Sequence, residues 1–463
     1  MSIEVTIKAL GAGGDGIAHH NGAKLFVPGA LPGERVRITP SPRRGHAKLL
    51  EQLSEAPSRE VPPCNHFGSC GGCVAQHMAS ATYSEWKCAT IRQALAHHGF
   101  HDVSIEPAIT SPPASRRRVR LAVEQPSSKF GATPEIGFRC RSSHRVVAIR
   151  HCSIMLPKLE ALLVPLARLV ARIDAEFNEL SLTAAPEGQD VILHGLGTAP
   201  NLAMREALAE FAHSEKIERI SVEYHETAKG SERRLRRRGR QKHNAASVLE
   251  TIVQLSAVRT HYGVVTVDLP LGAFLQPTAA GEAAIRRLVL DGLALHGVPS
   301  DDSKLGGTNN KTGKRVADCY AGLGGIGFAI AAHGGAMPPR HQVVMYEGNP
   351  KMAEAAQKAA DAAVRNVAAK MRDLVRCPLT PTELNCFDAV VFDPPRAGAQ
   401  TLAASLAAST VKRVVAVSCN PATFARDARI LANAGFRLMR LTPVDQFLWS
   451  RHIELVAVFQ RFS

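Results

Sequence analysis

Three cysteines lie close together in the first fifth of the chain. Cys64, Cys70 and Cys73 follow the spacing C-x5-C-x2-C, and a Gly-Gly pair separates the last two. Zinc and iron–sulfur clusters prefer thiolate ligands, and paired glycines let the backbone fold around a bulky group. Cys152, far along the chain, is the candidate fourth thiolate. The alternative is that these are inert cysteines packed as small hydrophobic residues. Three thiols at this spacing favour a metal or cluster site, and the absence of secretion signals argues against disulfides.

A second set of chemical groups follows strand-like segments near the C-terminus. The segment 314–318 leads into the glycine-rich stretch 319–327, and the segment 343–347 ends on Glu347. Glycines let the backbone approach a nucleotide at a helix N-terminus, and an acid at the next strand end accepts hydrogen bonds from ribose hydroxyls. The dinucleotide pattern G-x-G-x-x-G is not reproduced cleanly. The combination therefore favours S-adenosylmethionine over NAD.

Two further strand-like segments end in reactive residues. The segment 387–392 precedes Asp-Pro-Pro-Arg, which begins at Asp393, and the segment 413–418 precedes Cys419. In open α/β sheets, reacting groups lie beyond the carboxyl ends of the strands. Asp393 and Cys419 are therefore expected at the same edge as the glycine loop. A lone cysteine at a strand end is more often structural, but this shared edge favours a catalytic role for Cys419.

The elements that must position these residues divide the chain into three predicted domains. Residues 1–58 contain many short strands with turn signals, which is typical of a small β-barrel. Residues 59–270 contain the cysteine loop, a helix expected over 83–98 and further α+β structure. Residues 271–463 alternate strands with helical segments, which predicts a doubly wound parallel sheet. The predicted fold class is therefore α/β, preceded by a small barrel and a central α+β domain.

The charge balance points to a polyanionic partner. Lys and Arg number 56 against 41 Asp and Glu, which gives a net charge of +15. Such a charge favours nucleic acid first and an acidic membrane surface second. No apolar run is long enough to span a bilayer, and no signal peptide is visible at the N-terminus. Ten cysteines without a secretion signal fit the reducing cytoplasm.

A run of positive charge occupies residues 233–242, where seven of the ten residues are Lys or Arg. Such a run repels itself and predicts a loop. The loop could bind RNA phosphates or could simply be solvated, and the sequence leaves both interpretations open.

Taken together, these motifs resemble the S-adenosylmethionine-dependent RNA 5-methyluridine methyltransferases. The chain is most similar to the bacterial 23S ribosomal RNA members, which carry an N-terminal TRAM domain and a [4Fe–4S] cluster. The resemblance covers nearly the whole chain. Its motifs are C-x5-C-G-G-C-x2-Q-H at 64–77, Cys152, Phe274-Leu275-Gln276, the loop 318–327, Asp-Pro-Pro-Arg at 393–396, Ser-Cys-Asn-Pro at 418–421 and His452-Ile453-Glu454.

The resemblance implies a class I, Rossmann-like methyltransferase domain and a covalent mechanism. Uracil C5 is a poor nucleophile, so a thiolate that adds to C6 would activate it, with Cys419 as the candidate. Glu454 is the candidate base that removes the C5 proton, because it opens a last strand that runs antiparallel in such sheets. The roles implied for the other residues are orientation of the base and the cofactor by Gln276 and Asp393, and binding of the cofactor by Tyr320, Gly325, Glu347 and Asp373.

The chain departs from its relatives in the cofactor loop. Tyr320 stands where relatives usually have Phe, and Gly325 stands where they have Asn, so that contacts at this position would come from the backbone. The basic run 233–242 and the stretch 305–310 have no counterpart in the family pattern. The resemblance also implies that the four cysteines bind a [4Fe–4S] cluster with a structural role. A zinc site stays open, although zinc ligand pairs more commonly read C-x2–4-C.

The expected substrate is an unstacked uridine in a loop of 23S rRNA, because C6 is not reachable inside a helix. Two alternatives stay open: a tRNA uracil-C5 methyltransferase, and a non-catalytic RNA-binding protein on the same fold. The tRNA branch usually lacks both the cluster cysteines and the TRAM domain. We expect a cytoplasmic monomer without a membrane partner.

Overall fold

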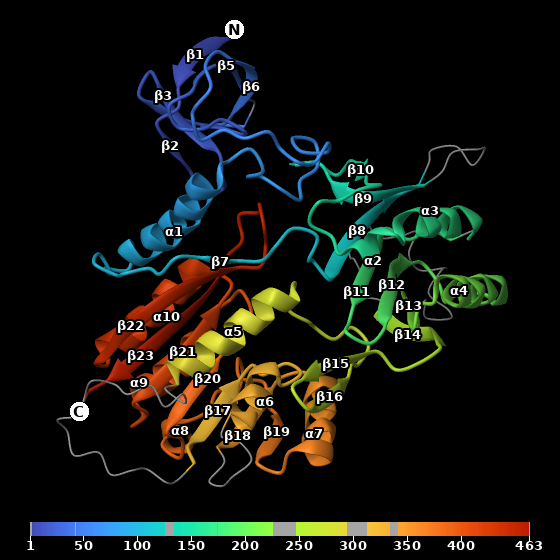
Figure 1. Ribbon diagram of the computed structural model, residues 1–463, viewed down its shortest axis with the longest axis vertical. Coiled ribbons are helices and arrows are strands. Elements are labelled where there is room, and N and C mark those ends of the chain that lie inside the picture. The colour runs from blue at the N-terminus through green and yellow to red at the C-terminus, as the bar shows by residue number, and fades with distance from the viewer. Residues whose placement is uncertain are drawn as a thin grey trace, which may run out of the picture.

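The computed structural model of the chain describes residues 2–41, 43–125, 134–141, 143–173, 175–225, 247–293, 313–333 and 341–462. The basic run 233–242 and the stretch 305–310 lie outside the described residues. Figure 1 shows a small N-terminal unit of strands, a central sheet with helices beside it, and a large C-terminal sheet. Among the helices of the described ranges, none combines the length and apolar character that crossing a bilayer requires.

The N-terminal unit consists of two small antiparallel sheets packed on one core. Alternation sets the inward side, since Val36 and Ile38 are buried while the arginines between and before them face outward. These residues pack with Val5, Ile7 and Val27. The two sheets contain β1 (Ile3–Thr6), β5 (Arg35–Pro40) and β6 (Ala47–Gln52), and β2 (Ala9–Leu10), β3 (Gly16–His20) and β4 (Ala23–Val27).

Helix α1 (Ser80–Ala96) joins the N-terminal unit to the C-terminal sheet. The indole Nε1 of Trp86 donates a hydrogen bond to the Gly11 carbonyl at 2.8 Å, which fixes one end of the helix to the strands. Ile91 and Leu95 pack in the core of the C-terminal half. The helix therefore connects two parts of the chain that are far apart in sequence.

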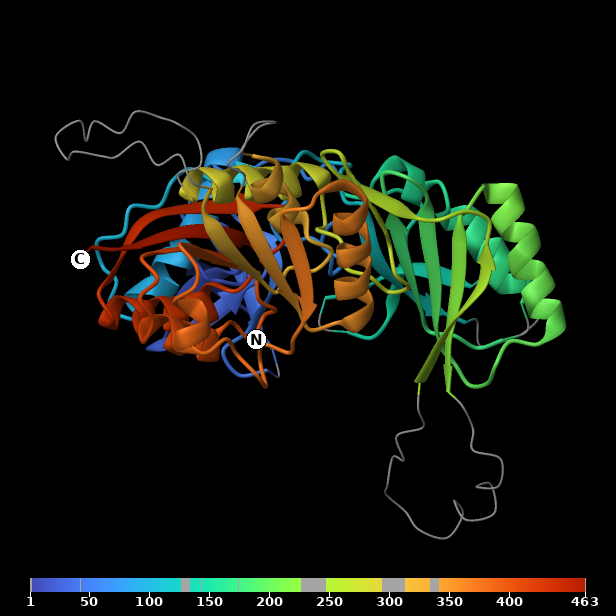
Figure 2. The ribbon, with the colours of Figure 1, turned by 90° about the horizontal axis from the view of Figure 1, so that it is seen from below.

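The central domain is a seven-stranded sheet in the order β10-β9-β8-β11-β12-β13-β14. Only β12 and β13 pair in parallel, because α4 provides the crossover between them. Figure 2 shows α3 and α4 at the outer side of this sheet. The elements are β8 (Arg118–Glu124), β9 (Glu135–Arg139), β10 (Val146–Ala148), α2 (Pro157–Glu160), α3 (Leu163–Arg172), β11 (Glu179–Ala184), β12 (Gln189–Leu196), α4 (Leu202–Glu215), β13 (Arg219–His225) and β14 (Ser247–Gln254).

The C-terminal sheet has the order β19-β18-β17-β20-β21-β23-β22-β7. Strands β19 to β21 are parallel, and β23 runs antiparallel between β21 and β22, as predicted for the strand that carries Glu454. The central strands are buried along almost their whole length, as a parallel sheet covered on both faces requires. The strands are β7 (Ile109–Thr110), β17 (Arg315–Cys319), β18 (Gln342–Glu347), β19 (Val367–Met371), β20 (Ala389–Phe392), β21 (Arg413–Ser418), β22 (Phe436–Asp445) and β23 (Glu454–Arg461).

Helices cover both faces of this sheet, so the predicted α/β architecture is confirmed. One face packs against α5 (Ala279–Gly292), α6 (Gly325–Ala332) and α7 (Pro350–Ala363), and the other against α1, α8 (Pro381–Leu384), α9 (Gln400–Ala407) and α10 (Pro421–Asn433). The hairpin of β15 (Arg259–Tyr262) and β16 (Val265–Asp268) shares the core of the first face. The domain boundaries at 58 and 270 stay predictions.

Candidate active site

A cavity of about 880 Å³ opens at the carboxyl ends of the parallel strands. Strands β17, β18, β19, β20 and β21 each deliver a loop to it, and antiparallel β23 begins at the same edge. The structure therefore brings together every residue predicted to react or to bind the cofactor. The eight predicted residues that lie in the cavity wall are Gln276, Tyr320, Gly325, Glu347, Asp373, Asp393, Cys419 and Glu454.

The loop between β17 and α6 has an unusual backbone conformation. Tyr320, with φ of 62°, adopts the left-handed conformation, which is uncommon for a residue with a side chain. Glu347, at the end of β18, accepts hydrogen bonds from the backbone N–H of Gly322 at 2.9 Å and of Asn349 at 2.7 Å. A Cβ at Gly325 would lie 3.0 Å from the Tyr262 ring, so this glycine lets the ring approach the loop. The carboxylate therefore fixes the loop that precedes α6.

Asp373 lies on the loop after β19, on the same side of the cavity as Glu347. One of its carboxylate oxygens accepts hydrogen bonds from the backbone N–H groups of Val375 and Arg376, at 3.0 and 3.1 Å. Its side chain is about half exposed, which leaves oxygen lone pairs free for a ligand.

Burial raises the pKa of Tyr320 to about 12, so its hydroxyl stays a hydrogen-bond donor.

Two amides, one in the cavity wall and one buried behind it, connect Asp393 with Glu454. The side-chain Nε2 of Gln276 donates to Asp393 at 3.1 Å, and Nε2 of Gln446 donates to Oε1 of Gln276 at 2.7 Å. Gln446 is almost fully buried, in space left by Gly281, where a Cβ would come within 2.6 Å of Gln446 Cβ. Gln446 was not predicted from the sequence, because nothing in its surroundings distinguishes it from a strand-end polar residue.

The two buried carboxyls, Glu454 and Asp393, share one electrostatic environment. Burial, and then the charge of Asp393, raises the pKa of Glu454 well above its ordinary value, while hydrogen bonding to Gln446 opposes this. Burial raises the pKa of Asp393 to about 7, against the hydrogen bond from Gln276. Two buried like charges at one site disfavour simultaneous ionisation. The pair therefore retains a proton at neutral pH and can exchange one with a ligand.

Cys419 follows β21 and faces the cavity. Burial, followed by the charges of Glu454 and Asp393, raises the pKa of its thiol to about 11, and Arg396 lowers it. The thiol is therefore protonated at neutral pH in the free protein. Of the charged side chains that shift the pKa of this thiol, Arg396 is the positive one, and it favours the thiolate.

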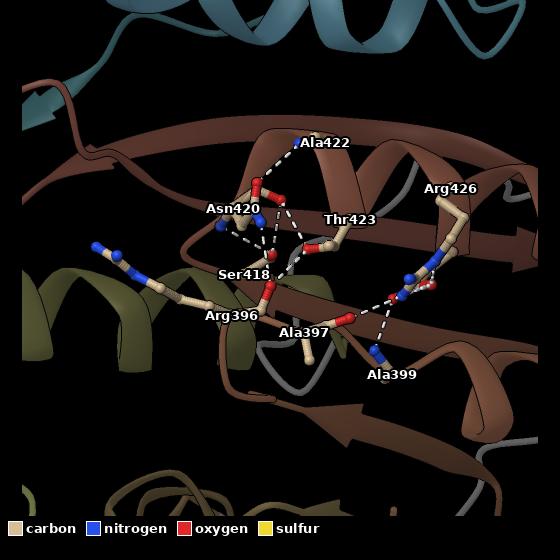
Figure 3. A network of polar contacts seen from close by, with 9 residues as sticks. Arg396, Ala397, Ala399, Ser418, Asn420, Ala422, Thr423 and Arg426 are labelled. Atoms are coloured by element: carbon tan, nitrogen blue, oxygen red, sulfur yellow. Dashed lines mark hydrogen bonds and ion pairs between the residues drawn. The ribbon is translucent and has the colours of Figure 1, made fainter. Parts of the chain in front are cut away.

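Hydrogen bonds tie the Arg396 loop to the Cys419 loop (Figure 3). The Arg396 carbonyl accepts from Asn420 Nδ2 at 3.0 Å and from Thr423 Oγ1 at 3.2 Å, and the Ala397 carbonyl accepts from Arg426 at 2.9 Å. The Arg396 side chain extends away from this network. Asn420 is also the N-cap of α10, since its side chain accepts from the backbone N–H of Ala422. The network fixes the two loops that carry Asp393 and Cys419.

The free end of Arg396 contacts His452, a cavity residue that the sequence interpretation placed in a motif without a role. The guanidinium Nη2 lies 3.0 Å from Nδ1 of His452. Burial and then the charge of Arg396 lower the pKa of His452 to about 4, so the imidazole is neutral and accepts this hydrogen bond. Because His452 is neutral and no carboxylate of the described residues forms an ion pair with Arg396, the positive charge of Arg396 can act on Cys419.

The four predicted cluster cysteines line a second, much smaller cavity. Its wall combines their thiols with the apolar side chains of Phe67, Phe138, Ile149 and Ile154. Gly71 has no room for a Cβ, which would lie 2.7 Å from the Arg139 carbonyl, so the glycine lets the loop pack on the central sheet. Among the described residues, no three His, Cys, Asp or Glu side chains are arranged to hold a single metal ion. The four cysteines in the wall of this second cavity are Cys64, Cys70, Cys73 and Cys152.

Comparisons with known proteins agree with this architecture. The tRNA (Uracil-5-)-methyltransferase family matches residues 358–461, and the TRAM domain matches residues 2–39. The crystal structure of Pyrococcus abyssi tRNA (uracil-54, C5)-methyltransferase in complex with S-adenosyl-L-homocysteine has a TM-score of 0.71 at 19% sequence identity. It covers 98% of this chain and 99% of that one. At this identity the similarity shows the fold, and it confirms the predicted class I architecture.

Relatives in sequence span the whole chain. A Caulobacter vibrioides protein named as an uncharacterized RNA methyltransferase is 36% identical over 99% of this chain and 100% of its own. The 23S rRNA (uracil(1939)-C(5))-methyltransferase RlmD of Chromohalobacter salexigens is 31% identical, over 99% of this chain and 89% of its own. The Salmonella typhimurium enzyme of the same name is 30% identical over 99% and 96%. The chain therefore belongs to the S-adenosylmethionine-dependent RNA (uracil-C5)-methyltransferase family, and the prediction that it is an enzyme of this kind is confirmed.

Proposed function

We propose that this protein transfers a methyl group from S-adenosylmethionine to C5 of a uridine in 23S rRNA through a covalent Cys419 adduct. The observation that carries the proposal is the common cavity. It holds a candidate nucleophile, a buried carboxyl pair and a loop whose backbone is fixed by Glu347. A non-catalytic RNA-binding protein would not need a raised-pKa carboxyl pair beside a cysteine. The alternative outside enzymology is therefore disfavoured.

The cavity fits the proposed cofactor. Glu347 and Asp373 present carboxylate oxygens for ribose hydroxyls and the adenine amino group, and Tyr320 lines the same cavity. Gly325 offers only backbone contacts at the start of α6. When bound, S-adenosylmethionine would supply an electrophilic methyl group on a sulfonium.

The protein's own residues account for the other steps. The Sγ of Cys419 loses its proton to solvent and forms a bond to C6 of uracil, and the C5–C6 π electrons move onto C5 and O4. C5 then takes the methyl group. A carboxylate of the Glu454–Asp393 pair removes the C5 proton, the C5–C6 double bond re-forms, and the Sγ–C6 bond breaks. We assign the removal of the proton to Glu454, because its buried Oε2 has no hydrogen-bond partner among the described residues, whereas Asp393 accepts a hydrogen bond from Gln276.

The substrate is proposed from the relatives. The RlmD proteins of similar length are named for uracil 1939 of 23S rRNA, whereas the structurally similar archaeal protein is named for a tRNA uracil. The TRAM domain and the four clustered cysteines favour the ribosomal substrate, and the bacterial ribosome places the reaction in the cytoplasm. We propose that the enzyme acts as a monomer, since one chain supplies all eight predicted site residues to one cavity.

We also propose that Cys64, Cys70, Cys73 and Cys152 bind a [4Fe–4S] cluster. All four thiols face one small cavity with apolar walls. In such a cluster each thiolate binds a different iron, so the ligands lie farther apart than around a single ion. This spacing is consistent with the absence, in the described part of the chain, of a group placed for one metal ion. The proposed role is structural, because the site joins the 64–73 loop to the segment that follows β10 of the central sheet.

A transfer assay with the methyl-tritiated cofactor tests the function. The wild-type protein is incubated with protein-free 23S rRNA and with tRNA, and the labelled nucleoside is identified after digestion. We expect 5-methyluridine in 23S rRNA alone. Label in tRNA only would show that tRNA is the substrate and would leave the proposed chemistry unchanged. Label on any atom other than uracil C5 would overturn the proposal.

A further inference from the structure

Two arginines of the central domain face the active-site cavity. Arg116 precedes β8 and Arg118 opens it, and both side chains lie in the cavity wall, half-buried. Residues two apart in an extended segment point to the same side. The backbone of Arg116 is held from two directions, by Ile154 and Leu156 on one side and by a bridge to Thr278 on the other. Both guanidinium groups therefore sit on a fixed support at the junction of two domains.

These two arginines differ from their neighbours in having no carboxylate partner among the described residues. Arg117, which points to the opposite side, pairs with Glu282 at 2.9 Å, and Arg120 pairs with Glu179 at 2.5 Å. Arg116 instead uses its Nε to donate to the Arg118 carbonyl, which leaves its Nη groups available. Burial lowers the pKa of both groups, and Arg116 and Arg120 lower that of Arg118 further.

Aromatic rings hold the guanidinium groups without neutralising them. Arg118 lies over the ring of Phe274 at 4.8 Å, and Arg116 lies 5.8 Å from the ring centre of Phe447. A cation over an aromatic face is attracted to it, but its N–H edges stay free to donate. Phe274 is itself 49% exposed in the cavity wall, which is unusual for a large apolar side chain beside a reacting site. The arrangement offers a flat apolar surface next to two oriented cations.

Half-buried, uncompensated guanidinium groups are costly, and an anion that binds them removes this cost. The planar fork of arginine matches the oxygens of a phosphate, to which it donates two parallel hydrogen bonds. The cavity also receives a nucleotide that has left its stack, and extrusion leaves its flanking phosphates in need of support. Phosphate contacts of this kind position an RNA without reading its sequence.

We propose that Arg118 and Arg116 form a phosphate subsite for the RNA backbone beside the reacting uridine. This inference rests on the proposed function, because it takes the RNA to be the occupant of the cavity. The cofactor carboxylate is the other anion that could enter. Two contacts argue against it: the arginines lie against Phe274 and Phe447, and neither ring belongs to the loops that carry Glu347 and Asp373.

The test measures RNA binding by fluorescence anisotropy over a range of salt concentrations. The probes are a 23S rRNA fragment containing uridine 1939 and a single-stranded, uridine-containing RNA of unrelated sequence. Wild type is compared with Arg118→Gln, Arg116→Gln and the double variant. Arg168→Gln is the matched control, because Arg168 is exposed on α3 and this substitution removes the same charge as the other two. Arg118→Lys keeps the charge and loses the fork. Binding of S-adenosylhomocysteine by calorimetry reports on folding and on the cofactor site.

We expect the double variant to lower the slope of log affinity against log salt by about 1.4, at about 0.7 for each contact to single-stranded RNA. The loss should be the same for both probes, because phosphates carry no sequence. Arg118→Lys should keep most of the wild-type slope that Arg118→Gln loses, and Arg168→Gln should have the wild-type slope. The affinity for S-adenosylhomocysteine should match that of wild type in every variant.

Three results would overturn the subsite. An unchanged salt slope in the double variant would show that the arginines bind no phosphate. Weaker binding of S-adenosylhomocysteine with unchanged RNA binding would assign them to the cofactor carboxylate. An unchanged slope in Arg116→Gln with a loss of bound iron would assign Arg116 to the cysteine site, since the charges of Cys73 and Cys152 act on Arg116. Because the probes report binding alone, these results decide the subsite even if the wild-type protein methylates neither RNA.

Discussion

At the scale of single residues, the site is dominated by acids and a thiol that burial keeps protonated. The pKa of Cys419 is about 11, that of Asp393 is about 7, and that of Glu454 is raised well above its ordinary value. The nucleophile and the base both act in their deprotonated forms, so the free protein at neutral pH is in the less reactive state. Arg396, next to a neutral His452, is the charge that lowers the cost of forming the thiolate.

This protonation pattern predicts the pH dependence of the reaction. Deprotonation of Cys419 and of Glu454 increases only as the pH rises toward their raised pKa values, so kcat/KM should increase steadily from pH 6 to pH 9. Initial rates of tritium transfer to RNA at constant ionic strength would measure this. A plateau reached below pH 6 would mean that the pKa of Glu454 is ordinary and that the pKa of Cys419 is lowered instead of raised, contrary to the electrostatics of the cavity.

The amide of Gln446 provides a second residue-scale prediction. It donates to Gln276 and also favours the ionised form of Glu454. Gln446→Leu keeps the volume and removes both hydrogen bonds. We expect kcat to fall on the order of tenfold, as the loss of a hydrogen bond to a charged group implies, and the pH profile to move to higher pH. KM for the cofactor should not change, and Gln93→Leu, on the exposed side of α1, should resemble wild type. A lower kcat without a shift of the pH profile would make Gln446 merely structural.

At the scale of elements, the sequence indicated the edge at which the site forms. Strand segments ending at Glu347, Asp393 and Cys419 were recognisable because their apolar runs stop at residues that can do chemistry. Parallel pairing then requires their ends to meet. The partners of α1 and of the β15–β16 hairpin were not predictable, because apolar periodicity shows which side of an element is buried but not what covers it. Arg396 and His452 were visible as motif residues, whereas their contact depends on the loop conformation.

A buried ion pair connects α1 with the end of β22. Lys87 donates to Asp445 at 3.1 Å and also to the His452 carbonyl, and both members of the pair are almost completely buried. Tyr83 donates to the second oxygen of Asp445. The pair therefore anchors the segment that carries Gln446, His452 and Glu454.

Removing one partner should be costly, because it leaves a buried charge without compensation. We expect Lys87→Met to lower the free energy of unfolding by about 3 kcal/mol, within the usual range for breaking a buried pair, as measured by urea denaturation. Lys351→Met, at an exposed position on α7, is the control and should change stability by less than about 0.5 kcal/mol. A loss as small as the control's would show that water or another group compensates Asp445.

At the scale of the whole molecule, the two cavities lie at the junctions between units that are far apart in sequence. The active-site cavity takes its wall from the central sheet as well as the C-terminal sheet, and the cysteine cavity joins the 64–73 loop to residues near 152. The order of the units was predictable from motifs, but the arginines at the interface were not, since only the assembled fold shows that no carboxylate of the described ranges pairs with them. The basic run 233–242 lies outside the described residues, and its role as an RNA contact stays a prediction.

The proposed cluster can be tested on the intact protein. Anaerobically purified wild-type protein should be brown and contain about four irons and four labile sulfides per chain. Cys152→Ser should lose most of both, while Cys386→Ser, at an exposed cysteine outside the site, should keep them. Colourless wild-type protein that contains one zinc per chain would show that the four cysteines bind zinc and not an iron–sulfur cluster.

The central claim is that Cys419 forms a bond to uracil C6, and trapping that bond tests it most directly. A 23S rRNA fragment with 5-fluorouridine at the target position should be methylated and then remain attached, because fluorine cannot leave C5 as a proton does. The complex should run as a slower band on a denaturing gel, its mass should equal protein plus methylated RNA, and peptide mapping should place the RNA on Cys419. Cys419→Ala should form no adduct while binding S-adenosylhomocysteine as wild type does. An adduct mapped to another residue, or turnover retained by Cys419→Ala, would contradict the account.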